Sequence, residues 1–287
     1  MLKLSVYTLS LPTLAPPEAA ELVSSLGFTG IEWRYSETTA ARSGESPSFT
    51  GNNLCTIDPG SYTAQTVAKL CATNGLVPVG LAPYLDVGDI DGFRRVATYA
   101  REIGARNIRL RAPSIDGRGF PELFSEGRAF FEAVEEVARE TGVRGLLEMH
   151  QRTLCASASM AERMVRGLDP AQVGVIYDVG NLVLEGYEDP RMGLSLLGPY
   201  LAHVHLKNAG WRRGQSASGG HRWVSFWSPL DEGMLDIASF LALLDDSGYA
   251  GWVSLEDLCT NRDCMETLAF NASLLRQWGF MNDPGIA

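Results

Sequence analysis

Short apolar runs alternate with longer amphipathic segments from one end of this chain to the other, and this alternation limits the folds open to it. The runs are rich in Val, Ile and Leu, as expected for strands that are buried on both faces of a parallel sheet. The segments between them carry apolar residues at helical spacing, and glycines mark the ends of several. We therefore expect eight strands, each followed by a helix or a helix-sized segment. The expected strands are 2–8, 30–35, 76–82, 107–112, 145–150, 173–180, 202–208 and 252–257.

Eight such units in a chain of 287 residues predict an α/β protein with a single (β/α)₈ TIM barrel domain over residues 1–287. A doubly wound open sheet is the alternative fold. That fold usually has a glycine-rich phosphate-binding turn after the first strand, and the sequence YTLSLPTLAPPE at 7–18 contains no glycine. No linker, internal repeat or low-complexity tract divides the chain, so one domain is the simpler interpretation.

One segment, residues 209–235, interrupts the alternation of strands and helices. Its sequence, AGWRRGQSASGGHRWVSFWSPLDEGML, has no clear periodicity. Loops of this length inside a compact domain are usually functional or disordered, and a disordered loop rarely holds so many aromatic residues. Three of the six tryptophans lie in it, namely Trp211, Trp223 and Trp227. We therefore expect a long lid loop after the seventh strand, over the mouth of the barrel.

The charge and cysteine content of the chain disfavour several kinds of partner. With 24 Lys and Arg against 34 Asp and Glu, the net charge is −10, which disfavours nucleic acid and anionic membrane surfaces. No apolar run approaches the roughly 20 residues that a membrane-spanning helix needs. The five cysteines show no Cys-x-x-Cys spacing, which is typical of reduced thiols. We expect a soluble cytoplasmic protein that binds neither nucleic acid nor membrane.

Polar side chains share one face on two of the expected strands. On the fifth, alternation places Glu148 and His150 on the same side. On the seventh, it places His203, His205 and Lys207 together. Strands of a parallel barrel are buried on both faces, so polar groups within them are costly unless they are paired or bound to a metal. These residues therefore indicate a buried polar site inside the barrel.

Four consecutive strands end in an acidic or imidazole side chain, and these are Glu148, Asp178, His205 and Glu256. In barrels the carboxyl ends of the strands converge on the active site. Three carboxylates placed together repel one another unless a cation neutralises them. Three oxygen donors and one imidazole suit one divalent metal ion, Mn²⁺, Mg²⁺, Co²⁺ or Zn²⁺. We expect His203, one layer deeper, to be a hydrogen-bonded core residue rather than a ligand.

Other inward-facing polar residues have two interpretations. Such a residue either contacts a substrate or pairs with another charged group inside the barrel. A single Glu at the end of a strand is itself more often an ion-pair partner than a ligand, and only the set of four favours a metal site. Both interpretations stay open for Glu32, Arg34, Arg109, Arg111, His150 and Lys207.

Four motifs occur in order along the second half of the chain. They are LLEMH at 146–150, YDVGNLVLEG at 177–186, HVHLKN at 203–208 and GYAGWVSLED at 248–257. Together they resemble the xylose-isomerase-like superfamily of barrel sugar isomerases and epimerases, and the resemblance runs from the first expected strand to the last. It implies a divalent metal held by the same four residues that the alternation selected.

The resemblance also implies a reaction and a set of roles. In the ketose epimerases of the superfamily, the metal polarises a carbonyl and two glutamates act as acid and base on opposite faces of the substrate carbon. Carried over, Glu148 and Glu256 are both ligands and catalytic groups. The implied activity is that of a metal-dependent isomerase or epimerase of a small sugar or polyol-derived ketone, acting through an enediolate, and a homo-oligomer is compatible with the family. The expected substrate contacts are His150, Asn181, Lys207 and Arg213.

Two departures from the family pattern keep other activities open. Many members have Asp-x-x-His after the sixth strand, whereas this chain has Asn181, an amide that binds a sugar hydroxyl better than a metal. This counts against the abasic-site endonuclease branch of the superfamily. The ketose epimerases have an arginine six residues after the metal-binding histidine, and here that position is Trp211. The alternatives are a metal-dependent dehydratase or lyase of an inosose- or dehydroshikimate-like ketone, and a sugar-binding barrel without catalysis.

Overall fold

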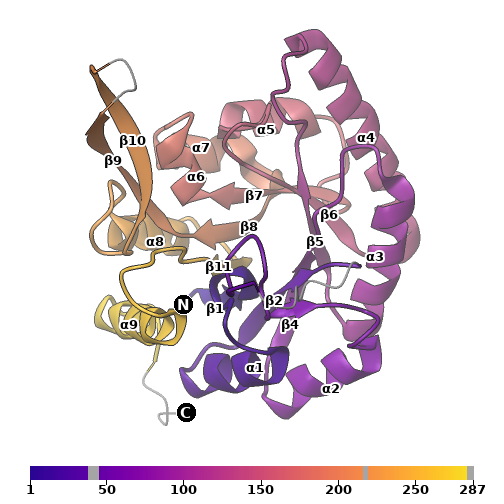
Figure 1. Cartoon of the computed structure of the whole chain (residues 1–287). Coiled ribbons are helices and arrows are strands. Elements are labelled where there is room, and N and C mark those ends of the chain that lie inside the picture. The colour runs from indigo at the N-terminus through magenta and orange to yellow at the C-terminus, as the bar shows by residue number, and fades with distance from the viewer. Residues whose placement is uncertain (38–44, 216–218, 283–287) are drawn as a thin grey trace.

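The computed structural model describes residues 1–37, 45–215 and 219–282. The barrel strands are β1 (Lys3–Tyr7), β2 (Gly30–Tyr35), β4 (Val77–Ala82), β5 (Asn107–Arg111), β6 (Arg144–Glu148), β7 (Val173–Asp178), β8 (Leu201–Leu206) and β11 (Trp252–Leu255). These eight strands are parallel and close into a barrel, because β1 pairs with both β2 and β11 (Figure 1). The short β3 (Thr56–Ile57) extends the sheet beside the end of β2.

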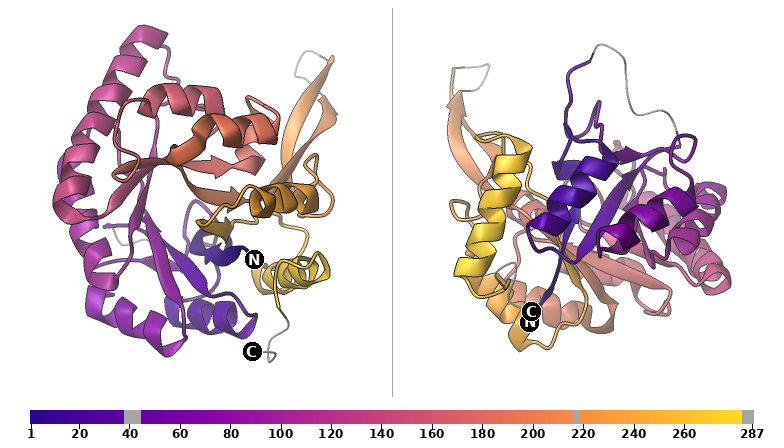
Figure 2. Two further views of the ribbon diagram at one scale, coloured as in Figure 1. Left: turned by 180° about the vertical axis from the view of Figure 1, so that it is seen from behind. Right: turned by 90° about the horizontal axis from the view of Figure 1, so that it is seen from below.

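Helices connect the strands and surround the barrel (Figures 1 and 2). They are α1 (Pro16–Ser25), α2 (Ala64–Thr73), α3 (Ile90–Ile103), α4 (Phe120–Thr141), α5 (Ala158–Val165), α6 (Val179–Leu184), α7 (Pro190–Leu197), α8 (Ile237–Asp246) and α9 (Cys264–Gln277). Side chains cap the first free N–H groups of several, as Asp89 does for α3. Gly104 and Gly142, both left-handed, end α3 and α4. In sequence order, α9 follows the last strand and completes the ring between α8 and α1.

The (β/α)₈ barrel predicted from the sequence is confirmed, and the expected strands lie within a residue or two of the observed ones. The continuous apolar runs were a reliable signal because each barrel strand has neighbours on both sides. None of the helices in the described ranges is both long and apolar enough to cross a lipid bilayer. The single-domain organisation, the cytoplasmic location and a homo-oligomer stay predictions.

The two faces of the barrel strands differ in polarity. Outward-facing residues such as Leu147 and Val204 are fully buried in the apolar core beneath the helices. Inside the barrel, polar groups pair with one another, as Ser5 and Ser254 do through their hydroxyl oxygens, which are 2.7 Å apart. Burial of so many polar groups is tolerated where their partners lie within hydrogen-bond distance. The interior of the barrel is therefore where the site residues gather.

The prediction of an irregular loop at 209–235 is wrong, since most of this segment forms an antiparallel hairpin. Its strands are β9 (Asn208–Gln215) and β10 (His221–Ser228), with Trp223 opposite Arg213. The hairpin projects from the barrel beside α6 and α7 (Figure 1). An exposed two-stranded ribbon has no single buried face, so it lacks the one-sided apolar pattern by which strands are found in a sequence. The role of this segment as a lid stays a prediction.

Candidate metal centre

The barrel brings four acidic or imidazole side chains together at its carboxyl end. Glu148 ends β6, Asp178 ends β7, His205 lies near the end of β8, and Glu256 directly follows β11. All four are buried, and one potential ligand atom from each lies within 4.8 Å of the others. These are the residues that the sequence selected as ligands. Such a buried group of acidic and imidazole donors could bind a metal ion.

His205 lies at the centre of this group and uses its two ring nitrogens differently. Its Nε2 is 3.2 Å from both carboxylate oxygens of Glu32. Its Nδ1 is 3.3 Å from Glu148 Oε1, 3.3 Å from Glu256 Oε2 and 3.7 Å from Asp178 Oδ2. Among the described residues no hydrogen bond satisfies Nδ1, although the ring is buried. With the proton on Nε2 and directed to Glu32, the Nδ1 lone pair points among three carboxylates, as a metal-binding histidine does.

Two buried cations, Arg109 and Lys207, form hydrogen bonds with the carboxylates of the centre. Arg109 Nε donates to Glu148 Oε2 at 2.8 Å, and Lys207 Nζ donates to Asp178 and Glu256. Burial raises the pKa of Glu148, but the charge of Arg109 together with the nearby histidines outweighs burial, and this pKa lies well below its usual value. Burial also raises the pKa of Asp178, but Lys207 and His205 lower it. The pKa of Asp178 therefore lies below its usual value. Both carboxylates are therefore ionised at neutral pH.

The donor set fits a divalent cation on charge as well as on geometry. Glu32 and the three carboxylates of the centre are negative, whereas Arg109 and Lys207 supply two positive charges. With both histidines neutral, two negative charges remain, and a divalent ion would balance them. The unsatisfied Nδ1 of His205 supplies the one nitrogen donor of such a site. Oxygen donors with one imidazole suit Mg²⁺, Mn²⁺, Co²⁺ and Zn²⁺ and do not select among them.

Glu32 and His203 form a layer beneath this centre. His203 Nε2 is 3.0 Å from Glu32 Oε2 and 3.0 Å from Ser254 Oγ, so the prediction of a hydrogen-bonded core histidine is confirmed. Burial raises the pKa of Glu32, but His205 and His203 outweigh it and hold the pKa well below its usual value. Glu32 therefore orients the His205 ring, an alternative that the sequence left open.

Asn181 holds the carboxylate of Asp178 through two hydrogen bonds. Its backbone N–H donates to Asp178 Oδ1 at 2.9 Å, and its side-chain amide donates to Asp178 Oδ2 at 2.7 Å. The amide also donates to the carbonyl of Met149, while its own Oδ1 has no hydrogen-bond partner among the described residues. The contacts thus assign Asn181 a positioning role, and its role as a substrate contact stays a prediction.

The other predicted substrate contacts lie in different surroundings. Half-buried His150 follows β6, and its Nδ1 lies 2.7 Å from the carbonyl oxygen of Gln151. Lys207 is buried at the centre itself. Arg213 is exposed on β9, further out along the hairpin, and within the described ranges no ion pair joins it to the four candidate ligands. The structure therefore brings His150 and Lys207 to the centre but not Arg213.

Two aromatic residues lie at the centre, and the sequence analysis missed Tyr7 and placed Trp227 only in the expected lid. The ring of Tyr7, at the end of β1, stacks on His205 with centroids 5.4 Å apart, and its hydroxyl has no partner among the described residues. Trp227, on β10, has its ring 5.3 Å from Lys207 Nζ. The position of Tyr7 at the carboxyl end of the first strand was the available signal. Only barrel closure brings it against a residue so far away in sequence.

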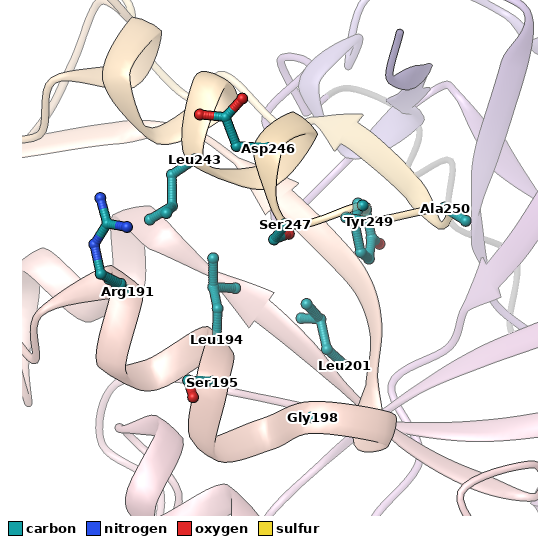
Figure 3. A pocket seen from close by; sticks show the side chains of 11 residues that line it. Arg191, Leu194, Ser195, Gly198, Leu201, Leu243, Asp246, Ser247, Tyr249 and Ala250 are labelled. Atoms are coloured by element: carbon teal, nitrogen blue, oxygen red, sulfur yellow. The ribbon is translucent and has the colours of Figure 1, made fainter.

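A second cavity lies away from this centre. It has a volume of about 580 Å³ and lies between α7 and α8, where Leu194, Leu201 and Leu243 line it (Figure 3). Leu201 begins β8 and Ala250 precedes β11, so the cavity faces the amino ends of the strands. Active sites of barrels form at the carboxyl ends. The candidate active site is therefore the metal centre and not this cavity.

A comparison with protein families agrees with the fold. Residues 20–275 match the model described as Xylose isomerase-like TIM barrel. The chain belongs to this family. The match covers the elements from α1 to α9, including all four strands that carry the candidate ligands.

Individual relatives of this family member differ in the reaction they are named for. An inosose dehydratase of Lacticaseibacillus casei is 28% identical over 134 residues, which are 44% of this chain and 44% of that protein. The chain thus spans less than half the length of this curated relative. Among solved structures, the probable 3-DHS dehydratase of petrobactin synthesis from Bacillus anthracis has a TM-score of 0.73 at 20% identity, covering 96% of this chain and 99% of that one. The 3-keto-D-glucoside 4-epimerase of E. coli has a TM-score of 0.72 at 16% identity, covering 96% and 100%. At these identities the structures establish the fold alone.

Proposed function

We propose that this protein is a metal-dependent dehydratase that acts on a small polyol-derived ketone. The observation that carries the proposal is the unsatisfied Nδ1 of His205, which points among three buried carboxylates at the carboxyl end of the barrel. The similarity to inosose dehydratases supports dehydration over the isomerase or epimerase activity expected from the sequence. In this proposal the ligands are Glu148, Asp178, His205 and Glu256.

The reaction begins with a proton next to the substrate carbonyl. A divalent ion, when bound by the four ligands, supplies Lewis acidity at this carbonyl and makes the neighbouring C–H more acidic. Glu148, kept ionised by Arg109, accepts the proton, and the electrons of the C–H bond move toward the carbonyl oxygen. Lys207, whose third N–H is free of Asp178 and Glu256, donates to a substrate oxygen.

The second step expels a hydroxyl group from the next carbon. The electrons return from the oxygen to form a carbon–carbon double bond, and the C–O bond of the hydroxyl breaks. His150 follows β6, the strand that Glu148 ends, and is half-buried, so we assign its imidazole to give the departing hydroxyl its proton. The products are water and an α,β-unsaturated ketone.

An isomerase or epimerase remains the second candidate. In that reaction Glu256 returns a proton to the opposite face of the carbon from which Glu148 removed one. The fold shared with the keto-glucoside epimerase is compatible with this chemistry. The hydrogen bond from Lys207 to Glu256 disfavours it, because this carboxylate is already engaged within the centre.

One assay separates these candidates. The protein is loaded with Mn²⁺, Mg²⁺, Co²⁺ or Zn²⁺ in turn and incubated in D₂O with inososes, neutral ketoses, keto sugar acids and keto sugar phosphates. Glu148→Gln is the control. Dehydration produces ultraviolet absorption of an enone, whereas epimerisation incorporates deuterium without new absorption. Neither signal with any metal would favour the sugar-binding barrel, and the proposal would then be abandoned.

A further inference from the structure

Two buried arginines lie over one tyrosine ring on the side of the barrel formed by β2, β4 and β5. Arg34 of β2 and Arg109 of β5 are each only 6% exposed. The guanidinium carbon of Arg34 is 5.1 Å from the centroid of Tyr84, and that of Arg109 is 5.6 Å from it. Three of the four candidate metal ligands come from the opposite side, formed by β7, β8 and β11. The two sides of the barrel mouth therefore differ in charge.

The hydrogen bonds of these arginines are incomplete. Arg34 donates through Nη1 to the hydroxyl of Thr56, while its Nε has no hydrogen-bond partner in the described part of the chain. Arg109 uses Nε and Nη2 for Glu148, and its Nη1 likewise has no partner among the described residues. Within the described ranges, no carboxylate forms an ion pair with Arg34. A buried cation without an acidic partner is costly, so its retention calls for an anion that is supplied from outside the chain.

A small side chain and a partly exposed ring lie beside these arginines. The strand between the two arginines, β4, carries only Ala82 at the register position of Arg34. Tyr84 follows this strand and is 43% exposed, so the pair borders solvent. A guanidinium that stacks on a ring uses its face and keeps its N–H edge available for an oxyanion in the plane. The free N–H groups of Arg34 and Arg109 are edge groups of this kind.

We infer that Arg34 and Arg109 bind an oxyanion of the substrate, either a carboxylate or a phosphate. The inference rests on the proposed function, because it takes the metal centre as the place where the ketone end of the same molecule reacts. The substrate class is then an acidic ketone, such as a keto sugar acid or a keto sugar phosphate, rather than a neutral inosose. Arg109 would contact both ends, since it also holds Glu148.

Binding of unreactive polyols tests this inference without any turnover. Sorbitol, gluconate and sorbitol 6-phosphate share a six-carbon chain and differ in charge. Calorimetric titration is carried out before and after dialysis against EDTA, so that contact between gluconate and a metal is recognised. We expect one of the two anions to bind about tenfold more tightly than sorbitol, or better, and the identity of that anion distinguishes carboxylate from phosphate. Equal affinity for all three would overturn the inference.

Variants assign the preference to these side chains. Arg34→Gln should abolish it, and Arg34→Lys, which keeps the charge but loses the planar fork, should reduce it. Arg118→Gln is the matched control, because Arg118 is partly exposed and already pairs with Asp116. A preference that survives in folded Arg34→Gln protein, or that is undiminished in folded Arg34→Lys protein, would show that Arg34 only balances internal charge. If the anion preference depends on Arg34 but no ketone reacts, the inference stands and the proposed dehydratase does not.

Discussion

β8 and β9 follow one another almost directly in the sequence, yet β8 buries polar side chains whereas β9 exposes an aromatic and a charged one. On β8, His203 and His205 are 2% and 0% exposed. On β9, Trp211 is 38% exposed and Arg213 is exposed as well. The difference comes from their neighbours, since β8 lies between β7 and β11 whereas β9 pairs only with β10. A closed barrel provides partners for polar groups and buries them. The two-stranded ribbon provides no such neighbours, so its aromatic groups stay exposed.

Substitutions in the barrel and in the hairpin should differ in their effect on the free energy of unfolding. At the metal centre, Lys207 has Asp178 and Glu256 as partners within hydrogen-bond distance, so the loss of one group leaves another buried and unpaired. On the hairpin the side chains already contact solvent, and a substitution there changes little. Equivalent substitutions should therefore have large effects near β8 and small effects along the outer part of β9 and β10.

The largest effect is expected from removal of two carboxylates. Glu148→Gln/Glu256→Gln should lose the bound metal, of which the natural protein should hold about one divalent ion per chain. Any metal-dependent turnover should fall by about 10²–10⁴-fold, because the proton acceptor is lost too. Elemental analysis and a rate assay measure the two effects. The control is Glu21→Gln/Glu232→Gln, which removes two exposed carboxylates. Equal metal content in both variants would refute the proposed centre.

The next effect concerns stability and the contrast between buried and exposed ion pairs. Lys207→Met removes the ammonium that Asp178 and Glu256 share, and should lower the free energy of unfolding by about 3–5 kcal/mol without metal. Added Mn²⁺ should restore part of this loss, since a cation then neutralises both carboxylates. Urea unfolding with and without EDTA measures it. Arg166→Met breaks the exposed pair with Glu162 and should change stability little, so similar losses would contradict the comparison.

The barrel strands and the grouping of the four candidate ligands were predictable because they follow from local patterns. A strand with neighbours on both sides must be apolar on both faces, so an exception such as Glu148 or His205 stands out in the sequence. Parallel strands end at the same edge of the barrel, so residues at their carboxyl ends gather without further information. The spacing of two residues along the strand also predicted that His203 lies one layer below His205.

The partners of these residues could not be predicted in the same way. The stacking of Tyr7 on His205 depends on closure of the barrel between its first and last strands. The choice of Lys207 between a substrate and two carboxylates depends on distances across three strands. The hairpin was missed because its residues, such as Trp211 and Arg212, alternate between two solvent-facing sides. Contacts between distant segments and exposed ribbons thus required the structure.

The smallest effects are expected within the hairpin itself, where its base and its outer part should differ. Trp227→Ala removes the ring 5.3 Å from Lys207 Nζ and should raise KM about fivefold, the size of a partly buried cation–π contact. Trp223→Ala removes a ring that is 65% exposed and should leave KM unchanged. Steady-state kinetics with the substrate found in the D₂O assay measures both. An equal rise in KM for Trp223→Ala would mean that the outer hairpin also covers the substrate, as a lid would. No rise for Trp227→Ala would confine recognition to the barrel, because the ring beside the buried ammonium would then contribute nothing to binding.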